Sequence, residues 1–580
     1  MSETLKNADL KTAAWGWVEG QKEQLSAWHT NIWELAEPAW REYESCAWYV
    51  KILREHGFTV EEGSGGMPTA FAAEWTSPAG PGARILGYAE YDAIPGNCQA
   101  ASTKREPRTG MSRFAPGHTD PHSALGISTL AGFLAAKDAM ERHNIPGTLV
   151  YTGEPAEKVQ GSKVVHGLRG YYDNLDAIIS YHPFYMMPLC NTARWDTHCG
   201  SYYSKIYTFT CDNPEGWNNT YGDSPIPSSH SAARAPGADA ALFTMFSLTK
   251  TTQDSMLPQA GGWSLSEAIL TAGQATADNQ PAGLAQIQYS WRCPSLAEAD
   301  SVLAVLDRNA ELAAAASHCT VSSRWVARNR PGIANHTVAQ LAWENIAAVG
   351  APVLDERARE IGREIQASCG VEPMENPFHP ATAELISPQD AETKLRRHLP
   401  ATQQNWTSDD YVEMTWYAPT IRFYTARPTL APDPAGTPYP GWAMTAMGGI
   451  PETIDPTITV TGKMIAGMVL DLVTSPETLA EAKSELRPRR FGAAPWPRCC
   501  PPNSARPRTS AGPNTSARAR PATGGFPCPR KPGTRRGKYP WHHTSGRRRE
   551  VPPSSASWPR PGRGGRWRTS VPCPGRCRRR

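Results

Sequence analysis

The chain has 580 residues and a formal net charge of +4, but the charge is unevenly distributed. Residues 487–580 contain 22 Arg and 2 Lys against a single acidic residue, Glu550, so this segment carries +23 and the first 486 residues carry −19. The length suits two or three domains of roughly 100–200 residues each. Because the sequence lacks an apolar run of about 18 residues and a basic-then-apolar start, we expect neither a transmembrane helix nor a secretory signal.

Apolar spacing in the first part of the chain predicts alternating helices and strands. Residues 20–57 are expected to be helical and to end at Gly57. Strands are then predicted at 71–75, 85–92, 148–153 and 175–181, and helices at 122–143 and 157–168. This alternation predicts an α/β fold with a mainly parallel sheet and helices on both faces.

Near residue 196 the pattern changes to that of a small inserted α+β domain. Strands are predicted at 200–211 and 285–293, and helices at 237–249 and 296–316. The α/β pattern then resumes with a helix at 338–349, a strand at 421–426 and a helix at 458–473. We therefore expect a catalytic domain in two parts, residues 1–195 and 326–486, interrupted by an inserted domain over 196–325.

Residues 487–580 differ from the rest in composition. They contain 18 of the 53 Pro and have no hydrophobic periodicity, which predicts a disordered tail. One interpretation is a basic arm that binds nucleic acid. The other, which we favour, is translation in a shifted frame, because a shifted reading of residues 495–515 permits a protein-like sequence. We therefore expect no nucleic-acid partner.

Eight cysteines lie in the first 486 residues and five in the tail. The eight are scattered and form no CxxC pair. This distribution favours reduced thiols in a cytoplasmic enzyme over a disulfide framework or a structural zinc site.

Four short polar segments are expected just past the carboxyl ends of strands, where a sheet of this kind places its site. They are Asp92, GHTDPHS (117–123), GEPAEK (153–158) and YHP (181–183). Such segments meet at one edge of a parallel sheet, so their side chains are expected to form one site.

Asp120, His122 and His182 offer one carboxylate and two imidazoles. Three protein ligands with an open position are typical of a catalytic divalent metal. Glu157 is the expected general base for a water that the metal activates. Taken singly, Asp120 would be a helix cap, Glu157 a solvated carboxylate and each histidine a core or surface group. Their coincidence at strand ends favours the metal site.

Residues 20–480 resemble the aminoacylase-type metallopeptidases of clan MH, in the branch of aminobenzoyl-glutamate hydrolase and the auxin-conjugate amidohydrolases. The resemblance rests on EYDAIPG (90–96), GHTDPHS, GEPAE, LDAIISYHP (175–183) and GKMIAGMVLDLVTSPE (462–477). It implies that the inserted domain is a lid and dimerisation domain, that the protein is a homodimer or larger homo-oligomer, and that His230 contributes to catalysis. Arg234, Arg292 and Asn335 are further candidates for substrate binding.

The chain departs from this branch at three positions. Asp120 stands in place of a Cys that bridges two metals, Lys158 in place of a metal-ligand Glu, and, counting back from Lys463, Asp455 in place of a metal-ligand His. The resemblance thus implies that the ligands of one metal are kept, whereas the residues that would bind only the second metal are replaced. We expect one divalent transition metal per chain, such as manganese, zinc or cobalt, and a Lys158–Asp455 ion pair in the vacated second site.

One metal and a glutamate base suit water attack on an activated carbon, and a relative in this fold family removes the ring amine of 5-nitroanthranilate. The main functional prediction is therefore hydrolytic deamination of an electron-poor aromatic amino acid, such as 5-nitroanthranilate to 5-nitrosalicylate and ammonia. The alternative is an amidohydrolase of aminobenzoyl-glutamate or N-acyl amino acids. A non-catalytic binding protein is disfavoured, because Glu157 is intact. The expected small-molecule partner is an aromatic carboxylate substrate. We expect no association with a membrane.

Overall fold

The computed structural model describes residues 3–184, 188–212, 237–256, 262–273 and 282–491, and its larger sheet has seven strands in the order β1-β2-β4-β3-β5-β11-β6. Their bounds are β1 Thr59–Glu62, β2 Phe71–Thr76, β3 Arg84–Ala89, β4 Thr148–Gly153, β5 Ala177–Phe184, β6 Thr192–Ala193 and β11 Thr420–Ala426. Neighbours are parallel from β4 through β3 and β5 to β11, whereas β1, β2 and β6 pair antiparallel at the two ends.

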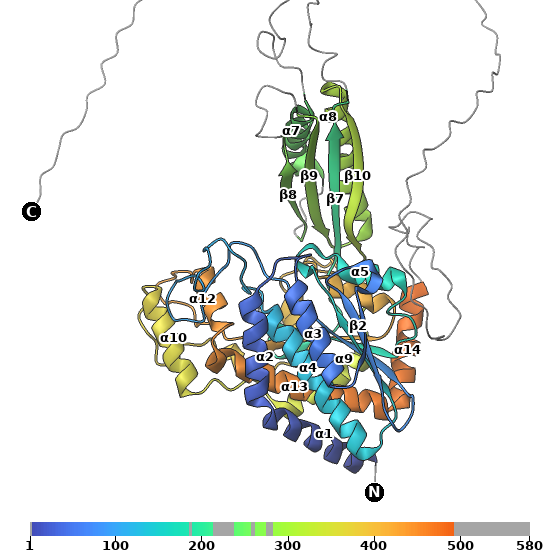
Figure 1. The fold of residues 1–580 in the computed structure, drawn as a ribbon, viewed down its shortest axis with the longest axis vertical. Coiled ribbons are helices and arrows are strands. Elements are labelled where there is room, and N and C mark those ends of the chain that lie inside the picture. Colours follow the sequence, from blue (N-terminus) through green and yellow to red (C-terminus); the bar gives the residue numbers. More distant parts are fainter. Residues whose placement is uncertain (1–2, 185–187, 213–236, 257–261, 274–281, 492–580) are drawn as a thin grey trace, which may run out of the picture. The chain divides into compact units, whose positions relative to one another are not determined.

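The central strands are covered on both faces, since every residue of β4 and β11 is buried. Parallel strands with this pattern are typical of α/β proteins. Helices α4 and α13 pack against β3 and β5, and α9 packs against β11 and β6 (Figure 1). The predicted α/β fold with a mainly parallel sheet is confirmed.

The helices of this domain are α1 Glu3–Gly20, α2 Lys22–Leu35, α3 Tyr43–Glu55, α4 His122–His143, α5 Ser162–Arg169, α9 His336–Val349, α10 Glu356–Ser368, α11 Pro388–Arg396, α12 Gly441–Met447, α13 Pro451–Thr474 and α14 Pro476–Phe491. Six of these eleven described helices, α2, α3, α4, α5, α9 and α13, fall in segments that the apolar pattern predicts to be helical, whereas α1, α10, α11, α12 and α14 were not predicted. Short 3₁₀ turns lie at Ser64–Gly66, Glu157–Val159, Pro380–Thr382 and Asp410–Trp416. Helix α14 thus continues five residues into the segment expected to be a disordered tail, whose remainder, 492–580, lies outside the described residues.

The single helical segment predicted over 20–57 is wrong in detail. Helices α2 and α3 are separate, because Pro38 and left-handed backbone at Ala36 (φ 40°) and Trp40 (φ 64°) interrupt the chain between them. The short helix predicted at 157–168 is likewise divided into a 3₁₀ turn and α5, with left-handed backbone at Gln160 (φ 52°).

Helices α4 and α13 form the centre of the core. Helix α4 is rich in Ala and Leu, which favour helix, and it ends at Asn144 in the left-handed conformation. A Cβ atom on Gly132 would lie 2.5 Å from Ile465, so only glycine allows α4 and α13 to approach this closely. Helix α13 is also long and apolar enough to span a membrane, but 72% of its most apolar window is buried within the protein.

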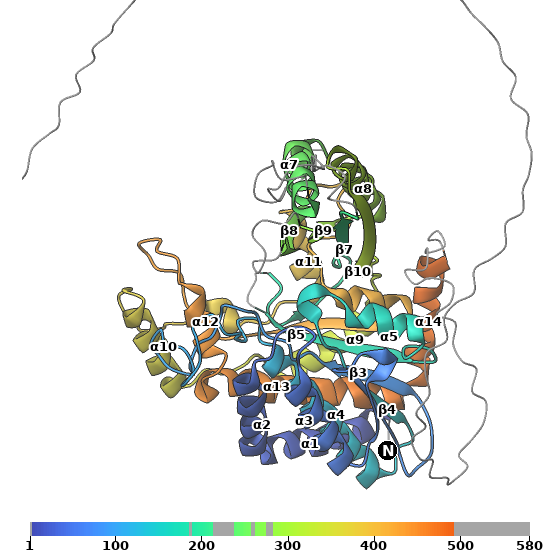
Figure 2. The ribbon, with the colours of Figure 1, turned by 45° about the horizontal axis from the view of Figure 1, so that its top comes forward.

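The inserted domain has its own antiparallel sheet, in the order β10-β7-β9-β8, with α7 and α8 packed against it (Figure 2). Its elements are β7 Ser201–Thr210, α7 Ala238–Met256, β8 Ser264–Thr271, β9 Leu284–Cys293, α8 Leu296–Ala316 and β10 Thr320–Asn329. Two of these strands, β8 and β10, were not predicted, and β10 continues to Asn329, past the expected boundary at 325. We refer to this domain as the lid.

Candidate active site

The four predicted segments meet at the carboxyl edge of the central sheet. Asp92 follows β3, His122 begins α4, Glu157 begins the turn after β4, and His182 lies near the end of β5. The Nε2 atom of His122 lies 3.7 Å from Oδ2 of Asp120 and 3.5 Å from Oε2 of Glu157. The structure therefore brings these predicted residues together.

His122 is oriented by a carboxylate on its far side. Its Nδ1 atom lies 2.8 Å from Oδ1 of Asp92, so this nitrogen donates and the lone pair is left on Nε2. The Nε2 atom is buried and has no hydrogen-bond partner among the described residues. Burial and Lys158 act to lower the pKa of His122, but nearby carboxylates, led by Asp120, raise it to about 9. The carboxylates thus favour a cation at this nitrogen.

His182 presents a second nitrogen to the same site. Its Nδ1 atom lies 2.7 Å from the carbonyl oxygen of Pro183 and must donate to it, which leaves the lone pair on Nε2. That atom lies 3.4 Å from Oδ1 of Asp120. Burial lowers the pKa of His182 to about 4, so the ring is neutral and suited to bind a metal.

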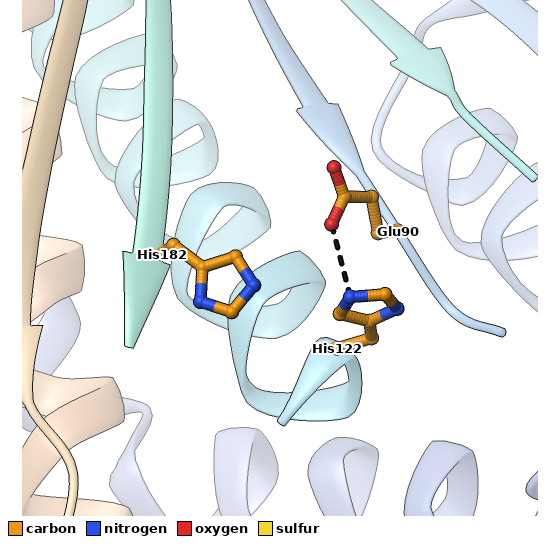
Figure 3. A group of neighbouring side chains, drawn as sticks. All are labelled: Glu90, His122 and His182. Carbon is orange, nitrogen blue, oxygen red and sulfur yellow. Dashed lines mark ion pairs between the residues drawn. The ribbon is translucent and has the colours of Figure 1, made fainter. Parts of the chain in front are cut away.

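Glu90 is a site residue that the sequence analysis missed. It follows β3 directly, and its Oε2 atom lies 3.2 Å from Nε2 of His122; the side chains of Glu90, His122 and His182 face a common space (Figure 3). Its Oε1 atom accepts from Nζ of Lys163 at 2.6 Å, and Lys163 also donates to Asp410 at 2.6 Å. All three residues of this Glu90–Lys163–Asp410 triad are buried. The available signal was that Glu90 stands two residues before Asp92, on the same side of an extended chain.

Lys158 lies between two carboxylates of the site. Its Nζ atom is 2.5 Å from Oδ2 of Asp120 and 2.5 Å from Oε2 of Glu157. Burial raises the pKa of Asp120 and of Glu157, but Lys158 outweighs it and lowers both. Both carboxylates are therefore ionised.

The predicted Lys158–Asp455 ion pair is wrong. Asp455 lies in α13 and lines a different surface hollow, with Lys22 and Ser26 from α2. Lys158 has its ion pairs with Asp120 and Glu157 instead. Asp455 does not line the cavity of the site, to which Met444 of the preceding helix α12 contributes.

A cavity of about 380 Å³ opens beside these residues. Asp120, Glu157, Lys158 and His182 line it, together with Arg292 from β9 of the lid. The cavity thus supports Arg292 as a candidate substrate-binding residue. Its other polar and aromatic lining includes Arg194, Cys199, Asp409, Arg422, Tyr424 and Arg427.

Asn335 does not line this cavity, and its predicted role in substrate binding is wrong. Its Oδ1 atom accepts from the backbone N–H of Val338 and caps α9, while its Nδ2 atom donates to the carbonyl of Ala482. Both polar atoms are therefore used in holding α9 and α14. His230 and Arg234 lie outside the described residues.

Three groups of side chains in the described part of the chain offer donor atoms within 4.8 Å of one another, namely Glu90–His122–His182, Asp120–His122–Glu157 and Glu157–Asp409–Asp410. The predicted ligands Asp120, His122 and His182 belong to the first two groups. Two imidazole nitrogens that face ionised carboxylates form a donor set that suits a divalent transition metal. The residues present therefore fit a metal ion.

The fold and this site define a class of enzyme, a hydrolase that uses a divalent metal. Comparisons with known proteins agree with this class. The chain is 23% identical over 442 residues to a p-aminobenzoyl-glutamate hydrolase subunit of Escherichia coli (strain K12), a match that covers 74% of this chain and 85% of the relative. It is also 28% identical over 184 residues to the Xaa-Arg dipeptidase of Mus musculus, covering 30% of this chain and 38% of that protein.

Among solved structures, an aminobenzoyl-glutamate utilization protein from Klebsiella pneumoniae matches 79% of this chain and 97% of its own, with 12% identity and a TM-score of 0.48. No family model matches the sequence. The sequence relationship confirms the predicted resemblance to the aminobenzoyl-glutamate hydrolase branch and the class of metal-dependent hydrolases acting on C–N bonds. It also supports the amidohydrolase alternative better than ring-amine removal.

Proposed function

We propose that Asp120, His122 and His182 hold a divalent metal and that Glu157 is the general base of a C–N hydrolase. The observation that carries this proposal is the buried Nε2 atom of His122. It has no hydrogen bond to the described residues, and carboxylate oxygens of Glu90, Glu157 and Asp120 lie 3.2, 3.5 and 3.7 Å from it. Such an arrangement suits a metal beside a proton acceptor.

The residues divide the chemistry between them. A divalent ion bound here supplies a Lewis acid and lowers the pKa of water. Glu157, which Lys158 holds in its ionised form, accepts the proton of the attacking water and passes it to the leaving nitrogen. Asp92 fixes the ring of His122, and Pro183 fixes that of His182.

We propose that one metal, such as manganese, zinc or cobalt, binds per chain. The Lys158 ammonium contacts both Asp120 and Glu157, so it stands where carboxylates would otherwise hold a second cation. Like charges at such short range repel strongly. We therefore expect Lys158 to exclude a second ion from the position between Asp120 and Glu157.

Amides of amino acids, of the aminobenzoyl-glutamate or N-acyl type, are the first candidate substrates. The support is the E. coli relative, whose match covers 85% of its length. Removal of a ring amine from an electron-poor aromatic amino acid, such as 5-nitroanthranilate, is the second. Lys158 favours this second candidate, because it would leave the site with a single metal. A single metal stabilises the oxyanion of amide hydrolysis less than a pair of metals does.

One experiment separates these candidates. The purified chain, loaded with manganese, zinc or cobalt, is incubated with p-aminobenzoyl-glutamate, N-acetyl amino acids and 5-nitroanthranilate, while free amino acid and ammonia are measured. Release of amino acid supports amide hydrolysis, and release of ammonia supports ring deamination. No product from any of these, in a protein that holds metal, would contradict the proposal; Glu157→Gln is the matched inactive control.

We also propose that the lid forms a homo-oligomeric contact. Strand β8 is at the edge of the lid sheet and exposes Ile269 and Leu270. Edge strands with exposed apolar side chains tend to pair with another chain. Light scattering of the purified protein tests this, and a monomer would contradict it.

A further inference from the structure

We propose that Arg194 and Tyr424 bind the carboxylate of an aromatic substrate. This inference depends on the proposed function in one respect: it assumes that the cavity beside His182 binds the substrate. Both residues line that cavity. Neither was a candidate from the sequence.

Arg194 is a buried charge with no carboxylate partner in the described part of the chain. Only 3% of the residue is exposed, and no described carboxylate lies within ion-pair distance of it. Its guanidinium donates from Nε to the Tyr424 hydroxyl at 2.7 Å, from Nη1 to the Thr197 carbonyl at 2.9 Å and from Nη2 to the Cys199 thiol at 3.5 Å. All three acceptors are neutral. Because burying an unpaired charge is costly, an anion in the adjoining cavity would stabilise this arrangement.

Tyr424 completes the anion site. Its hydroxyl oxygen accepts from Nε of Arg194 at 2.7 Å and from Nε of Arg422 at 3.3 Å. A guanidinium can only donate, so the phenol keeps its own proton for another acceptor. No described residue accepts that proton, and Tyr424 lines the cavity. Tyr424 therefore offers a donor beside the Arg194 guanidinium.

Strand pairing sets this donor pair next to the metal ligands. Tyr424 of β11 is the register partner of His182 of β5, and the backbone N–H of Arg194 donates to the carbonyl of Arg422. The carboxylate site and the proposed metal site thus lie on neighbouring strands. A substrate held at Arg194 would extend toward His182.

The wall of the cavity favours a flat ring. The rings of Phe184 and Tyr424 have centroids 4.6 Å apart and an interplanar angle of 34°, and both residues line the cavity. Aromatic faces pack well against a further aromatic ring. An aryl carboxylate could pack its ring against Phe184 and Tyr424 while its carboxylate accepts from the Arg194 and Tyr424 donors.

The charge of the cavity agrees with an anionic ligand. Cationic side chains outnumber carboxylates in its lining by five to three. The cations are Lys158, Arg194, Arg292, Arg422 and Arg427, and the carboxylates are Asp120, Glu157 and Asp409. Lys158 contacts Asp120 and Glu157, and Arg422 pairs with Asp409. A bound divalent metal would add further positive charge.

Calorimetric titration of the metal-loaded protein tests the inference with three probes: benzoate, its neutral analogue benzamide, and the non-aromatic cyclohexanecarboxylate. We expect benzoate to bind at least about tenfold more tightly than benzamide, because a charge-assisted contact is lost in the amide. We expect cyclohexanecarboxylate to bind more weakly than benzoate. Equal affinity of benzoate and benzamide would overturn the carboxylate site, and equal affinity of the two acids would overturn its aromatic character.

Variants show whether Arg194 is responsible. Arg194→Met should weaken benzoate binding at least about tenfold and leave benzamide unchanged. Tyr424→Phe, which keeps the ring, should weaken benzoate about three- to tenfold. Arg108→Met is the matched control, since Arg108 is also buried and donates to backbone carbonyls, of Trp33 and Pro116, but does not line the cavity.

Wild-type benzoate affinity in Arg194→Met would overturn the inference. If that variant does not fold, as judged by circular dichroism, unchanged benzoate binding by Tyr424→Phe would overturn it instead. Binding that depends on Arg194 in a protein that hydrolyses nothing would refute the proposed function alone. Hydrolysis without such binding would refute this inference alone.

Discussion

The Nζ atom of Lys158 lies 2.5 Å from Oδ2 of Asp120, and it contacts Glu157 at the same distance. A lysine ammonium therefore bridges the proposed metal ligand and the proposed base. An ammonium neutralises two carboxylates much as a metal would, but it offers no open coordination position. The number of ions that the site holds should depend on this one side chain.

Lys158→Glu should raise the number of bound divalent ions from about one to about two per chain. The change removes the cation and adds a carboxylate next to Asp120 and Glu157, and clustered oxygen ligands attract a second ion. Metal analysis after gel filtration gives the stoichiometry. Lys158→Met, which removes the charge without adding a ligand, is the control and should stay near one. Two ions in the unaltered chain would show that Lys158 does not exclude the second.

Glu157→Gln should lower turnover by roughly 10²–10⁴-fold, the usual cost of losing a general base. The metal should still bind, because the proposed ligands are Asp120, His122 and His182. Steady-state kinetics with the substrate found in the screen and metal analysis of the same sample check both statements. Near-normal turnover would place the base elsewhere.

Asp92→Asn should weaken metal affinity by about 10–100-fold, since Asp92 orients His122 through its Nδ1 atom. Competition with a chelator measures the affinity. Glu154→Gln is a matched control: Glu154 is an equally buried carboxylate that contacts His166 at 2.7 Å, but neither residue lines the cavity. Equal loss of affinity in the two variants would point to general destabilisation.

Asp455→Asn should stabilise the fold at neutral pH but not in acid. Burial raises the pKa of Asp455 from its ordinary value of 3.8 to about 6, so the folded state binds this proton more tightly than the unfolded state. Stability therefore falls as the pH rises from about 4 through about 6, and the penalty persists above that. The variant should gain on the order of 1–3 kcal/mol at pH 7.5.

Urea unfolding at pH 4 and pH 7.5 measures this difference. The exposed neighbour Glu452 provides the control, as Glu452→Gln should change stability little at either pH. A gain of equal size for Asp455→Asn at both pH values would mean that ionisation of Asp455 is not the cause.

Sequence patterns predict the long elements well, because many apolar positions repeat the same spacing. Helix α4 begins and ends at His122 and His143, as predicted, and β4 likewise matches its predicted bounds. Strand β8 escaped prediction because it lies at a sheet edge, where its residues are exposed or half-buried rather than alternately buried. Helix α1 was missed as well, although it packs on α4 and α13.

The site was predictable where its residues stand in short motifs at strand ends. It was not predictable where partners come from distant parts of the chain. Lys163 and Asp410 are 247 residues apart, and Arg194 and Tyr424 are 230 apart, so no local spacing connects them. Their pairing follows from the order of strands in the sheet, which the periodicity of single elements does not specify.

The contact of Lys158 with Asp120 and Glu157 has a genetic consequence. Lysine codons and glutamate codons differ only in their first base. If Lys158 excludes a second ion, a single nucleotide change separates a one-ion active site from a two-ion one, without any change in the fold. A lineage of such enzymes would need only that one mutational step to acquire or lose the second ion, and selection among substrates would then act on an already folded protein.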